Sequence, residues 1–295
     1  LSGACGGDWI GLSSMSACVV VTLDGKVHDP DQPLLCADDL AAVRGDGAFE
    51  TLLVRGGAPC GVELHLARLA VSAAAMDLPV PDADQWTRVS AGEGVLRLVL
   101  GRGREGGGAP TAYATVGPVH ERVARARAEG VSAITLDRGY SVDLAARAPW
   151  QLLGAKTLSY ATNMAALRYA ARQGADEVIY VSSERRVLEG PRSTVVLLRG
   201  KTLVTPPPEQ GILAGTTVGA LFDVAEARGY TCERAPLFPA DLIVAESVWL
   251  VSSITLAARV VALDGLALGG ASRADEMRSM VDIAVETIGD EAPEA

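Results

Sequence analysis

The stretch LLGAKTLSYATNM, residues 152–164, places Lys156 between an apolar segment and the expected start of a helix. A lysine in such a setting is expected to be partly buried, and burial lowers the pKa of an ammonium group towards the range where the neutral amine attacks a carbonyl carbon. The sequence has only two other lysines, Lys26 and Lys201, among its 26 lysine and arginine residues. Lys156 is therefore the first candidate for a catalytic residue, although an ordinary surface lysine fits the same local pattern.

Length and composition indicate a globular chain that acts on a small molecule. The 295 residues are 49% hydrophobic and 21% charged, which is enough apolar material for one or two domains. The net charge of −10 is spread along the chain and disfavours contact with nucleic acid or an anionic membrane surface. No apolar run is long enough to span a membrane. We therefore expect no nucleic-acid partner, no membrane association and a small-molecule substrate.

Cysteine and histidine usage favours a reducing compartment and no metal site. The five cysteines are odd in number and contain no C-x-x-C pair, which disfavours a disulfide framework and a zinc site. His28, His65 and His120 are too far apart in sequence to indicate a metal cluster. Residues 1–16 lack the basic and apolar regions of a signal peptide, so we expect a flexible extension there and a cytoplasmic protein.

Strand and helix patterns alternate along the chain without a repeat period, which predicts two α/β (or α+β) domains. The expected strands are 17–23, with a hairpin turn at Asp24-Gly25, and then 50–54, 95–100, 111–116, 131–136, 177–181, 193–198, 247–251 and 260–263. The expected helices are 63–77, 158–173, 216–228 and 274–287.

The domain boundary is expected where the pattern is interrupted. Residues 138–153 show no clear periodicity and contain Pro149-Trp150. We therefore predict an N-terminal α/β domain at 17–137, an interdomain connection at 138–153 and a C-terminal domain at 154–290.

Two segments place polar groups where they can contact a bound ring or a phosphate. Glu189 follows one expected strand and precedes another, and a carboxylate there can pair with a protonated ring nitrogen or simply occupy a turn. The segment GILAGTT, residues 211–217, leads into a helix with Thr216 and Thr217 at its start. Free backbone N–H groups and hydroxyls at a helix N-terminus bind phosphate, but threonine is also an ordinary N-cap.

The Gly-rich segment Gly101–Gly108 follows an expected strand and carries Arg102 and Arg104. Its first six residues match G-x-G-x-x-G, but a dinucleotide site needs a helix directly afterwards and another strand follows here. We therefore reject dinucleotide binding and predict a flexible hairpin loop. If the loop closes over a cleft, Arg102 holds a substrate carboxylate; a solvated arginine without a role fits the sequence about equally well.

Six motifs occur in an order that is more specific than any of them alone. They are GDGAFET (45–51), HLARL (65–69), Lys156, Glu189-Gly190, GILAGTT (211–217) and VSSIT (251–255). This series resembles the class IV pyridoxal-phosphate family, which contains branched-chain aminotransferases, D-amino-acid aminotransferases and 4-amino-4-deoxychorismate lyases. The resemblance spans about residues 17 to 270. It implies a two-domain fold-type IV enzyme, a homodimer, with an amino-acid-like substrate and pyridoxal 5'-phosphate in the interdomain cleft.

The resemblance implies a role for each matching residue. Lys156 corresponds to the lysine that anchors the cofactor covalently and acts as the catalytic base. Glu189 corresponds to the partner of the pyridine nitrogen. Arg68, Thr216 and Thr217 correspond to phosphate contacts.

The match departs from the family at two places. Ser253 and Thr255 fall in the last phosphate-contacting segment, but Ile254 stands where relatives often carry threonine, so that only its backbone can contribute. Tyr160 lies one position before the tyrosine that contacts the cofactor in branched-chain aminotransferases. Whether Tyr160 touches the cofactor is therefore open.

Within the family, the segments at 33–53 and 155–170 are most similar to actinobacterial aminodeoxychorismate lyases. The resemblance thus implies a lyase that releases pyruvate and 4-aminobenzoate for folate biosynthesis. A D-amino-acid or branched-chain aminotransferase is the alternative, in which Arg97 or Arg102 holds a substrate carboxylate. A non-catalytic protein that keeps the fold is the third possibility, disfavoured because Lys156, Glu189 and Arg68 are all present.

Overall fold

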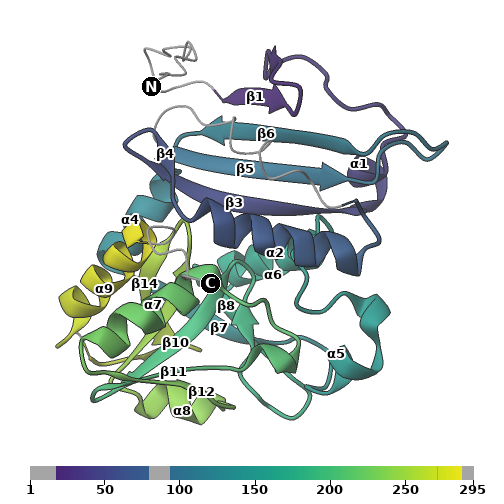
Figure 1. Ribbon diagram of the computed structural model, residues 1–295. Helices are drawn as coiled ribbons and strands as arrows, with labels where there is room; N and C mark the ends of the chain where they lie inside the picture. Colours follow the sequence, from purple (N-terminus) through teal and green to yellow (C-terminus); the bar gives the residue numbers. More distant parts are fainter. Residues whose placement is uncertain (1–17, 80–93, 271, 288–295) are drawn as a thin grey trace, which may run out of the picture.

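The computed structural model describes residues 18–79, 94–270 and 272–287, which form two sheets with helices packed on them (Figure 1). The first sheet has the order β2-β1-β6-β5-β3-β4 and is antiparallel throughout. Its strands are β1 (Val19–Thr22), β2 (Val27–His28), β3 (Gly47–Arg55), β4 (Ala58–Pro59), β5 (Gly94–Gly101) and β6 (Thr111–Gly117).

The second sheet is mixed and has the order β12-β11-β10-β13-β14-β7-β8, with β9 beside β10 and β15 beside β14. Its strands are β7 (Val131–Asp137), β8 (Glu177–Val181), β9 (Glu189–Gly190), β10 (Ser193–Arg199), β11 (Thr202–Thr205), β12 (Thr231–Arg234), β13 (Ser247–Ser252), β14 (Leu256–Leu263) and β15 (Leu266–Ala267). The helices of the described chain are α1 (Leu40–Arg44), α2 (Val62–Ala75), α4 (Glu121–Glu129), α5 (Leu144–Arg147), α6 (Ala161–Arg172), α7 (Thr216–Ala227), α8 (Pro239–Val244) and α9 (Ala274–Thr287).

Alternation along β3 and β5 gives the first sheet two different faces. Leu52 and Leu96 point to one face, where they pack against Leu69 of α2 in a fully apolar cluster. Successive side chains of a strand point to opposite faces, so Thr51 and Arg97, which are paired across β3 and β5, point the other way. This second face is free to line a pocket.

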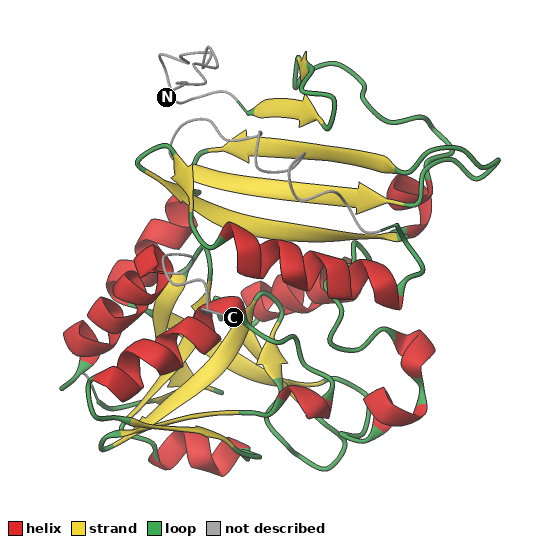
Figure 2. Cartoon of the chain, viewed as in Figure 1, coloured by secondary structure: helices red, strands yellow, loops and turns green. Residues whose placement is uncertain are grey.

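The second sheet is covered on both faces, which explains the continuous apolar run along β10. Val196 and Leu198 pack into a cluster with residues of α7 and α9, whereas Val195 and Leu197 pack into another with residues of α4 and α8. Figure 2 shows the helices grouped around this sheet and α2 lying along the first one. No helix within the described ranges is long and apolar enough to cross a membrane.

The mixed α/β fold is confirmed, and the expected strand pairs and long helices are present, with ends that differ by at most four residues. The largest shift is at β14, expected from 260 and observed from Leu256. Among the helices the largest shift is at α6, expected from 158 and observed from Ala161. Leu158 donates a backbone hydrogen bond to Gly47 of β3, and Thr157 bridges Ala48, so this segment is extended rather than helical. The expected extension at 1–16 and the first residue of the strand 17–23 lie outside the described residues.

The expected boundary after residue 137 differs from the division between the sheets. β7 pairs in parallel with β14 and β8, which places it in the second sheet together with α4 before it. Residues 138–153 therefore connect two strands of the same sheet, and the chain passes between the sheets at 118–120 instead. The apolar strand pattern at 131–136 does not reveal its partners, of which β14 lies more than a hundred residues later in the sequence. Treating the two sheets as separate domains remains a proposal.

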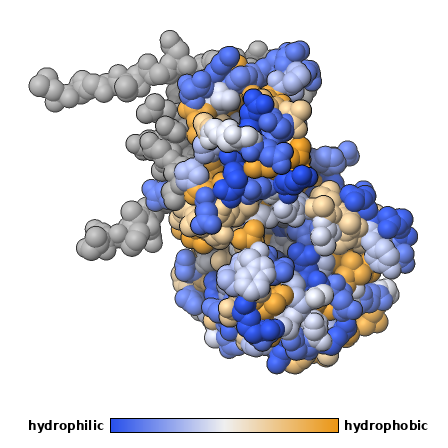
Figure 3. All heavy atoms as spheres, turned by 90° about the vertical axis from the view of Figure 1, so that its right-hand side faces the viewer, coloured by the Kyte–Doolittle hydropathy of each residue, from blue (hydrophilic) through white to orange (hydrophobic). Residues whose placement is uncertain are grey.

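The side of the molecule shown in Figure 3 is mostly hydrophilic, with apolar residues scattered among polar ones. Single exposed apolar side chains are ordinary on a protein surface.

Candidate active site

Two pockets meet at Lys156. The smaller, of about 320 Å³, is lined by Arg68, Glu189, Thr216 and Thr217. The larger, of about 650 Å³, lies between the free face of the first sheet and the second sheet. Their shared lining residues are Lys156, Tyr160, Arg192, Ser193, Ser252 and Ser253.

The backbone of Lys156 is fixed by strand β3 and helix α2. Its carbonyl accepts a hydrogen bond from the Phe49 N–H of β3 at 3.1 Å, and its own N–H donates to the buried Ser72 hydroxyl of α2 at 3.1 Å. The Lys156 Nζ lies 4.5 Å from the centre of the Phe49 ring. These contacts hold the amine where the two pockets join.

Burial lowers the pKa of Lys156 to about 8 from its ordinary 10.5. Glu50 and Glu189 favour the charged form, whereas the nearby cations Arg68 and Arg97 oppose it. A substantial fraction of the amine is therefore neutral near neutral pH, which is the form that attacks a carbonyl.

A buried cluster beside Lys156 orients Arg68. Glu50, which is fully buried on β3, accepts hydrogen bonds from Arg68 Nε at 2.7 Å, from Arg68 Nη2 at 2.9 Å and from His65 Nδ1 at 2.6 Å. Burial alone would raise the pKa of Glu50, but the hydrogen bonds from Arg68 and His65 outweigh it and lower the pKa to about 2. Arg68 Nη1 donates to the Ala214 carbonyl at 3.0 Å, so the guanidinium reaches from α2 to the segment before α7.

Glu189 lies on the opposite side of the smaller pocket. Burial raises the pKa of Glu189 to about 7, although the Leu213 N–H donates to its Oε2 at 3.1 Å and Arg138 lies near enough to oppose the shift. The charged form of this buried carboxyl group is stabilised by any cationic ring nitrogen that enters the pocket.

The start of α7 is open to an anion. Gly215 is its N-cap and makes no side-chain capping bond, so the first N–H groups of the helix have no side-chain acceptor there. A Cβ at Gly215 would lie 2.6 Å from Thr194 Oγ1, so only glycine fits this close approach. Thr216, Thr217 and Arg68 line the same pocket. Together they offer backbone donors, hydroxyls and a guanidinium to one phosphate-sized group.

Tyr160 forms part of the wall between the two pockets. Its hydroxyl donates to the Pro191 carbonyl at 2.6 Å, and its ring meets Phe49 edge-on at 5.4 Å between centroids. Burial raises the pKa of Tyr160, and the nearby Glu189 adds to the shift. Tyr160 is therefore a neutral, fixed ring next to Lys156.

The two predicted phosphate contacts after β13, Ser253 and Thr255, differ in the pockets that they line. Ser253 lines both pockets and donates to the Thr51 carbonyl at 2.7 Å. Thr255 lines only the larger pocket, so the geometry places it on the side away from the smaller pocket. The backbone of Ile254 is engaged by Arg127, whose Nη2 donates to the Ile254 carbonyl.

Arg102, predicted as a substrate contact, lines neither pocket. Arg102 follows the last residue of β5, and its Nε donates to Asp46 at 2.6 Å while its Nη2 donates to the carbonyl of Met76, which caps the end of α2. Arg97 of β5, the other arginine considered, does line the larger pocket.

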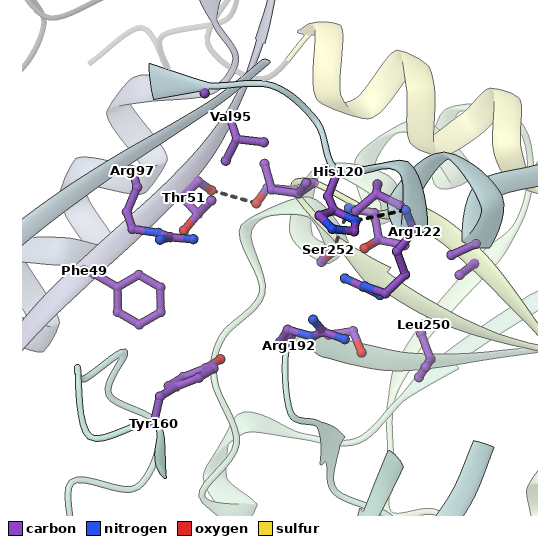
Figure 4. Close-up of a pocket in the computed structure, with 18 of the residues that line it drawn as sticks. Phe49, Thr51, Val95, Arg97, His120, Arg122, Tyr160, Arg192, Leu250 and Ser252 are labelled. Carbon is purple, nitrogen blue, oxygen red and sulfur yellow. Dashed lines mark hydrogen bonds between the residues drawn. The ribbon is translucent and has the colours of Figure 1, made fainter. Parts of the chain in front are cut away.

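Three arginines line the larger pocket: Arg97, Arg122 and Arg192. Figure 4 shows Arg97 beside Phe49, with Arg122 and Arg192 together elsewhere in the cavity. Sequence reasoning singled out neither Arg122 nor Arg192, and it gave Glu50 no role. The position of Glu50 inside RGDGAFET was the only available signal for it, and nothing local indicated the other two.

The chain matches the model of the amino-transferase class IV family over residues 47–263. The chain belongs to this family. A curated relative from Mycobacterium tuberculosis, the bifunctional aminodeoxychorismate lyase / D-amino acid transaminase, is 55% identical over 90% of this chain and 99% of its own length.

Solved structures agree with this class IV assignment. The pyridoxal-phosphate-bound form of a hypothetical aminotransferase from Mycobacterium tuberculosis is 55% identical, covers 93% of this chain and 100% of its own, and superposes with a TM-score of 0.89. A fold IV transaminase from Curtobacterium pusillum is 40% identical, covers 92% of this chain and 98% of its own, and gives a TM-score of 0.85. This class IV enzyme therefore has a fold-type IV architecture and pyridoxal 5'-phosphate as its cofactor.

The smaller pocket fits this cofactor. The uncapped start of α7 and Arg68 suit the phosphate, the shifted carboxyl of Glu189 suits the ring nitrogen, and the amine of Lys156 suits the aldehyde. Within the described ranges, no group of three or more His, Cys, Asp or Glu is placed to hold a metal ion.

Proposed function

We propose that this class IV enzyme is a 4-amino-4-deoxychorismate lyase that releases pyruvate and 4-aminobenzoate, a product used in folate biosynthesis. The observation that carries the proposal is the 55% identity, over almost its entire length, to a relative named for this activity. The larger pocket supports it, because its three arginines suit a substrate with two carboxylates.

In this proposal, Lys156 anchors the cofactor and then serves as the base. When its Nζ is not bound to the cofactor, the amine would stay at the junction of the pockets, because Phe49 and Ser72 hold the backbone of Lys156. The pKa of about 8 leaves the amine able to take a proton from the substrate carbon and to return it elsewhere.

The other residues hold the cofactor in position. Bound pyridoxal phosphate supplies an electron-withdrawing ring that makes the substrate carbon beside the amino group acidic. Glu189 keeps a proton on the ring nitrogen by accepting its hydrogen bond. Arg68, held by Glu50, and the start of α7 bind the phosphate. In the larger pocket, Arg97 lies beside Phe49, the ring that contacts Lys156, and binds a carboxylate.

A second function, transamination of D-amino acids, is favoured by the same relative, which is named for both activities. The two reactions share Lys156, Glu189 and the phosphate site. They differ in where the proton goes after it leaves the substrate carbon. We therefore propose D-amino-acid transamination as the second activity of this site.

Product analysis tests both proposals in one set of assays. Purified enzyme loaded with pyridoxal phosphate is supplied with aminodeoxychorismate, and 4-aminobenzoate is measured by its fluorescence together with pyruvate. Separate assays contain D-alanine or L-leucine with 2-oxoglutarate. Release of 4-aminobenzoate with equal pyruvate supports the lyase. If D-alanine or L-leucine reacts well and no 4-aminobenzoate appears, the lyase proposal fails while the cofactor site stands.

Assembly and location are also proposals. The class IV resemblance supports a homodimer, and the acidic, cysteine-poor composition supports a cytoplasmic enzyme. Analytical ultracentrifugation at micromolar concentration tests the first of these. A species of only 30.5 kDa, the mass of one chain, would exclude the homodimer.

A further inference from the structure

The larger pocket contains a cationic cluster at a distance from the lysine. Arg122 of α4 and Arg192, just before β10, both bind the same oxygen of Glu177. The distances to Glu177 Oε1 are 3.2 Å from Arg122 Nη1 and 2.6 Å from Arg192 Nη2. All three side chains line the pocket, and Figure 4 shows the two arginines beside each other.

The cluster carries more positive charge than its internal partner neutralises. Two guanidinium groups face one carboxylate, which leaves a net charge of about +1 in a partly closed pocket. In the part of the chain that the structure describes, the bonds to Glu177 are the only side-chain hydrogen bonds of either guanidinium. A guanidinium has five N–H donors, so most donors of both arginines are available to a ligand.

Burial and the neighbouring Arg192 both lower the pKa of Arg122. Two like charges are therefore held close together at a cost, and an anion between them would relieve the repulsion. The buried hydroxyl of Ser193, which lines both pockets, also has no hydrogen-bond partner among the described residues. A polar atom buried without a partner is unusual unless a ligand or water supplies one.

The position of the cluster distinguishes it from Arg97. Arg97 is close enough to Lys156 to lower the pKa of the lysine. Figure 4 shows Arg97 beside Phe49, whose ring centre lies 4.5 Å from Lys156 Nζ, and shows Arg122 and Arg192 together in another part of the pocket. One end of the pocket is thus cationic beside the reacting amine, and another end is cationic farther away.

We propose that Arg122 and Arg192, braced by Glu177, form a subsite for the second carboxylate of a dicarboxylate substrate, the one remote from the reacting carbon. This inference rests on the proposed function and adds a substrate class to it. The subsite favours substrates and amino acceptors with two acidic groups over monocarboxylates of the same length. Aminodeoxychorismate, which has two carboxylates, belongs to that class.

The test compares two inert probes that differ by one carboxylate. Glutarate and pentanoate have the same number of carbons, and their binding to the pyridoxal-phosphate-loaded enzyme is measured by isothermal titration calorimetry. Arg122→Gln is the main variant, because Arg122 lines only the larger pocket, whereas Arg192 also lines the cofactor pocket. Arg125→Gln is the matched control, since Arg125 is an exposed arginine of the same helix that lines neither pocket.

The parent should bind glutarate more tightly than pentanoate. Arg122→Gln should weaken glutarate binding about tenfold or more, as expected for the loss of a charge-assisted hydrogen bond, and should change pentanoate binding less than about twofold. Arg125→Gln should change neither. If Arg122→Gln does not fold, Arg122→Lys, which keeps the charge, should retain most of the preference for glutarate.

Two results would overturn the subsite. The first is a parent that binds both probes equally, and the second is an Arg122→Gln variant that weakens both probes by the same factor. Calorimetry does not depend on turnover. A parent that prefers glutarate but releases no 4-aminobenzoate would therefore refute the lyase proposal and leave the subsite standing. A parent that releases 4-aminobenzoate but binds glutarate and pentanoate equally would refute only the subsite.

Discussion

Replacing Glu50 with glutamine should destabilise the protein and weaken the cofactor site together. Glu50 is fully buried and accepts four hydrogen bonds: two from Arg68, one from His65 and one from the backbone N–H of Thr51. Glutamine keeps the shape but removes the charge and one acceptor oxygen. Arg68 then loses the partner that directs its guanidinium towards residue 214.

The structure gives the size of the effect. The drop in the pKa of Glu50 from 4.5 to about 2 corresponds to about 3 kcal/mol of folding stability. Removing one partner from a buried ion pair costs about 3–5 kcal/mol, which agrees. We expect the free energy of unfolding of Glu50→Gln to fall by about 3 kcal/mol, with weaker binding of pyridoxal phosphate because Arg68 is less well oriented.

The effect should depend on pH with a definite sign. Because the pKa of Glu50 is lowered in the folded state, its contribution is complete above about pH 4.5 and is lost as the pH falls towards 2. Glutamine does not titrate in this range. The difference in stability between the parent and Glu50→Gln should therefore be constant near neutral pH and shrink below about pH 4.5.

Urea unfolding at several pH values measures this difference, and fluorescence titration of the apoenzyme measures cofactor affinity. Glu63→Gln is the control, because Glu63 is an exposed glutamate on the same helix as Arg68. It should cost less than about 1 kcal/mol and leave cofactor affinity unchanged. A Glu50→Gln variant as stable as this control, or a loss of stability that does not shrink in acid, would refute the role given to Glu50.

Three further predictions concern the smaller pocket. Lys156→Ala should abolish the covalent attachment of pyridoxal phosphate, seen by mass spectrometry after borohydride reduction, and nearly all turnover; undiminished turnover would exclude Lys156 as the base. Since the pKa of Lys156 is about 8, capture of pyridoxal phosphate by the apoenzyme should accelerate as the pH rises through about 8, and a midpoint near the ordinary 10.5 would contradict the burial argument. Glu189→Gln should keep the cofactor but slow proton abstraction about tenfold to a hundredfold in single-turnover experiments, because a charge-assisted hydrogen bond of about 1.5–3 kcal/mol is lost. Loss of the cofactor, or an unchanged rate, would count against that role.

The cofactor side of the site could be located from the sequence because its residues occur in local motifs. Glu189 and Thr216 begin β9 and α7, and Lys156 lies in the segment that leads to α6, so all three positions can be recognised from neighbouring residues. The structure places all three around one pocket. The role of Glu50 could not be recognised in the same way, because its partners lie on a helix that packs against the strand, and strand alternation alone does not identify them.

Fold features were predictable where they depend on local patterning and not where they depend on distant partners. The hairpin at Asp24-Gly25 and the pair β5–β6 follow from turn residues and apolar alternation, and both are present. The sheet to which β7 belongs is decided by parallel pairing with β14 and β8. A run such as VSAITLD is compatible with either sheet, so the sheet to which β7 belongs could not be predicted from the sequence.

The substrate side was less predictable for a related reason. Arg97 and Arg102 lie five residues apart, and each is a reasonable carboxylate ligand by residue type. Strand alternation points Arg97 of β5 into the larger pocket, whereas Arg102 lies beyond the end of the strand and is held by Asp46. Arg122 and Arg192 come from a helix and a loop, and both form ion pairs with Glu177 on a third element. A cofactor site can be recognised from motifs, whereas a carboxylate subsite requires cations from several elements. Sequence alone therefore identifies this family more readily than its substrate. We expect lyase and transaminase relatives to differ at the arginines of the larger pocket.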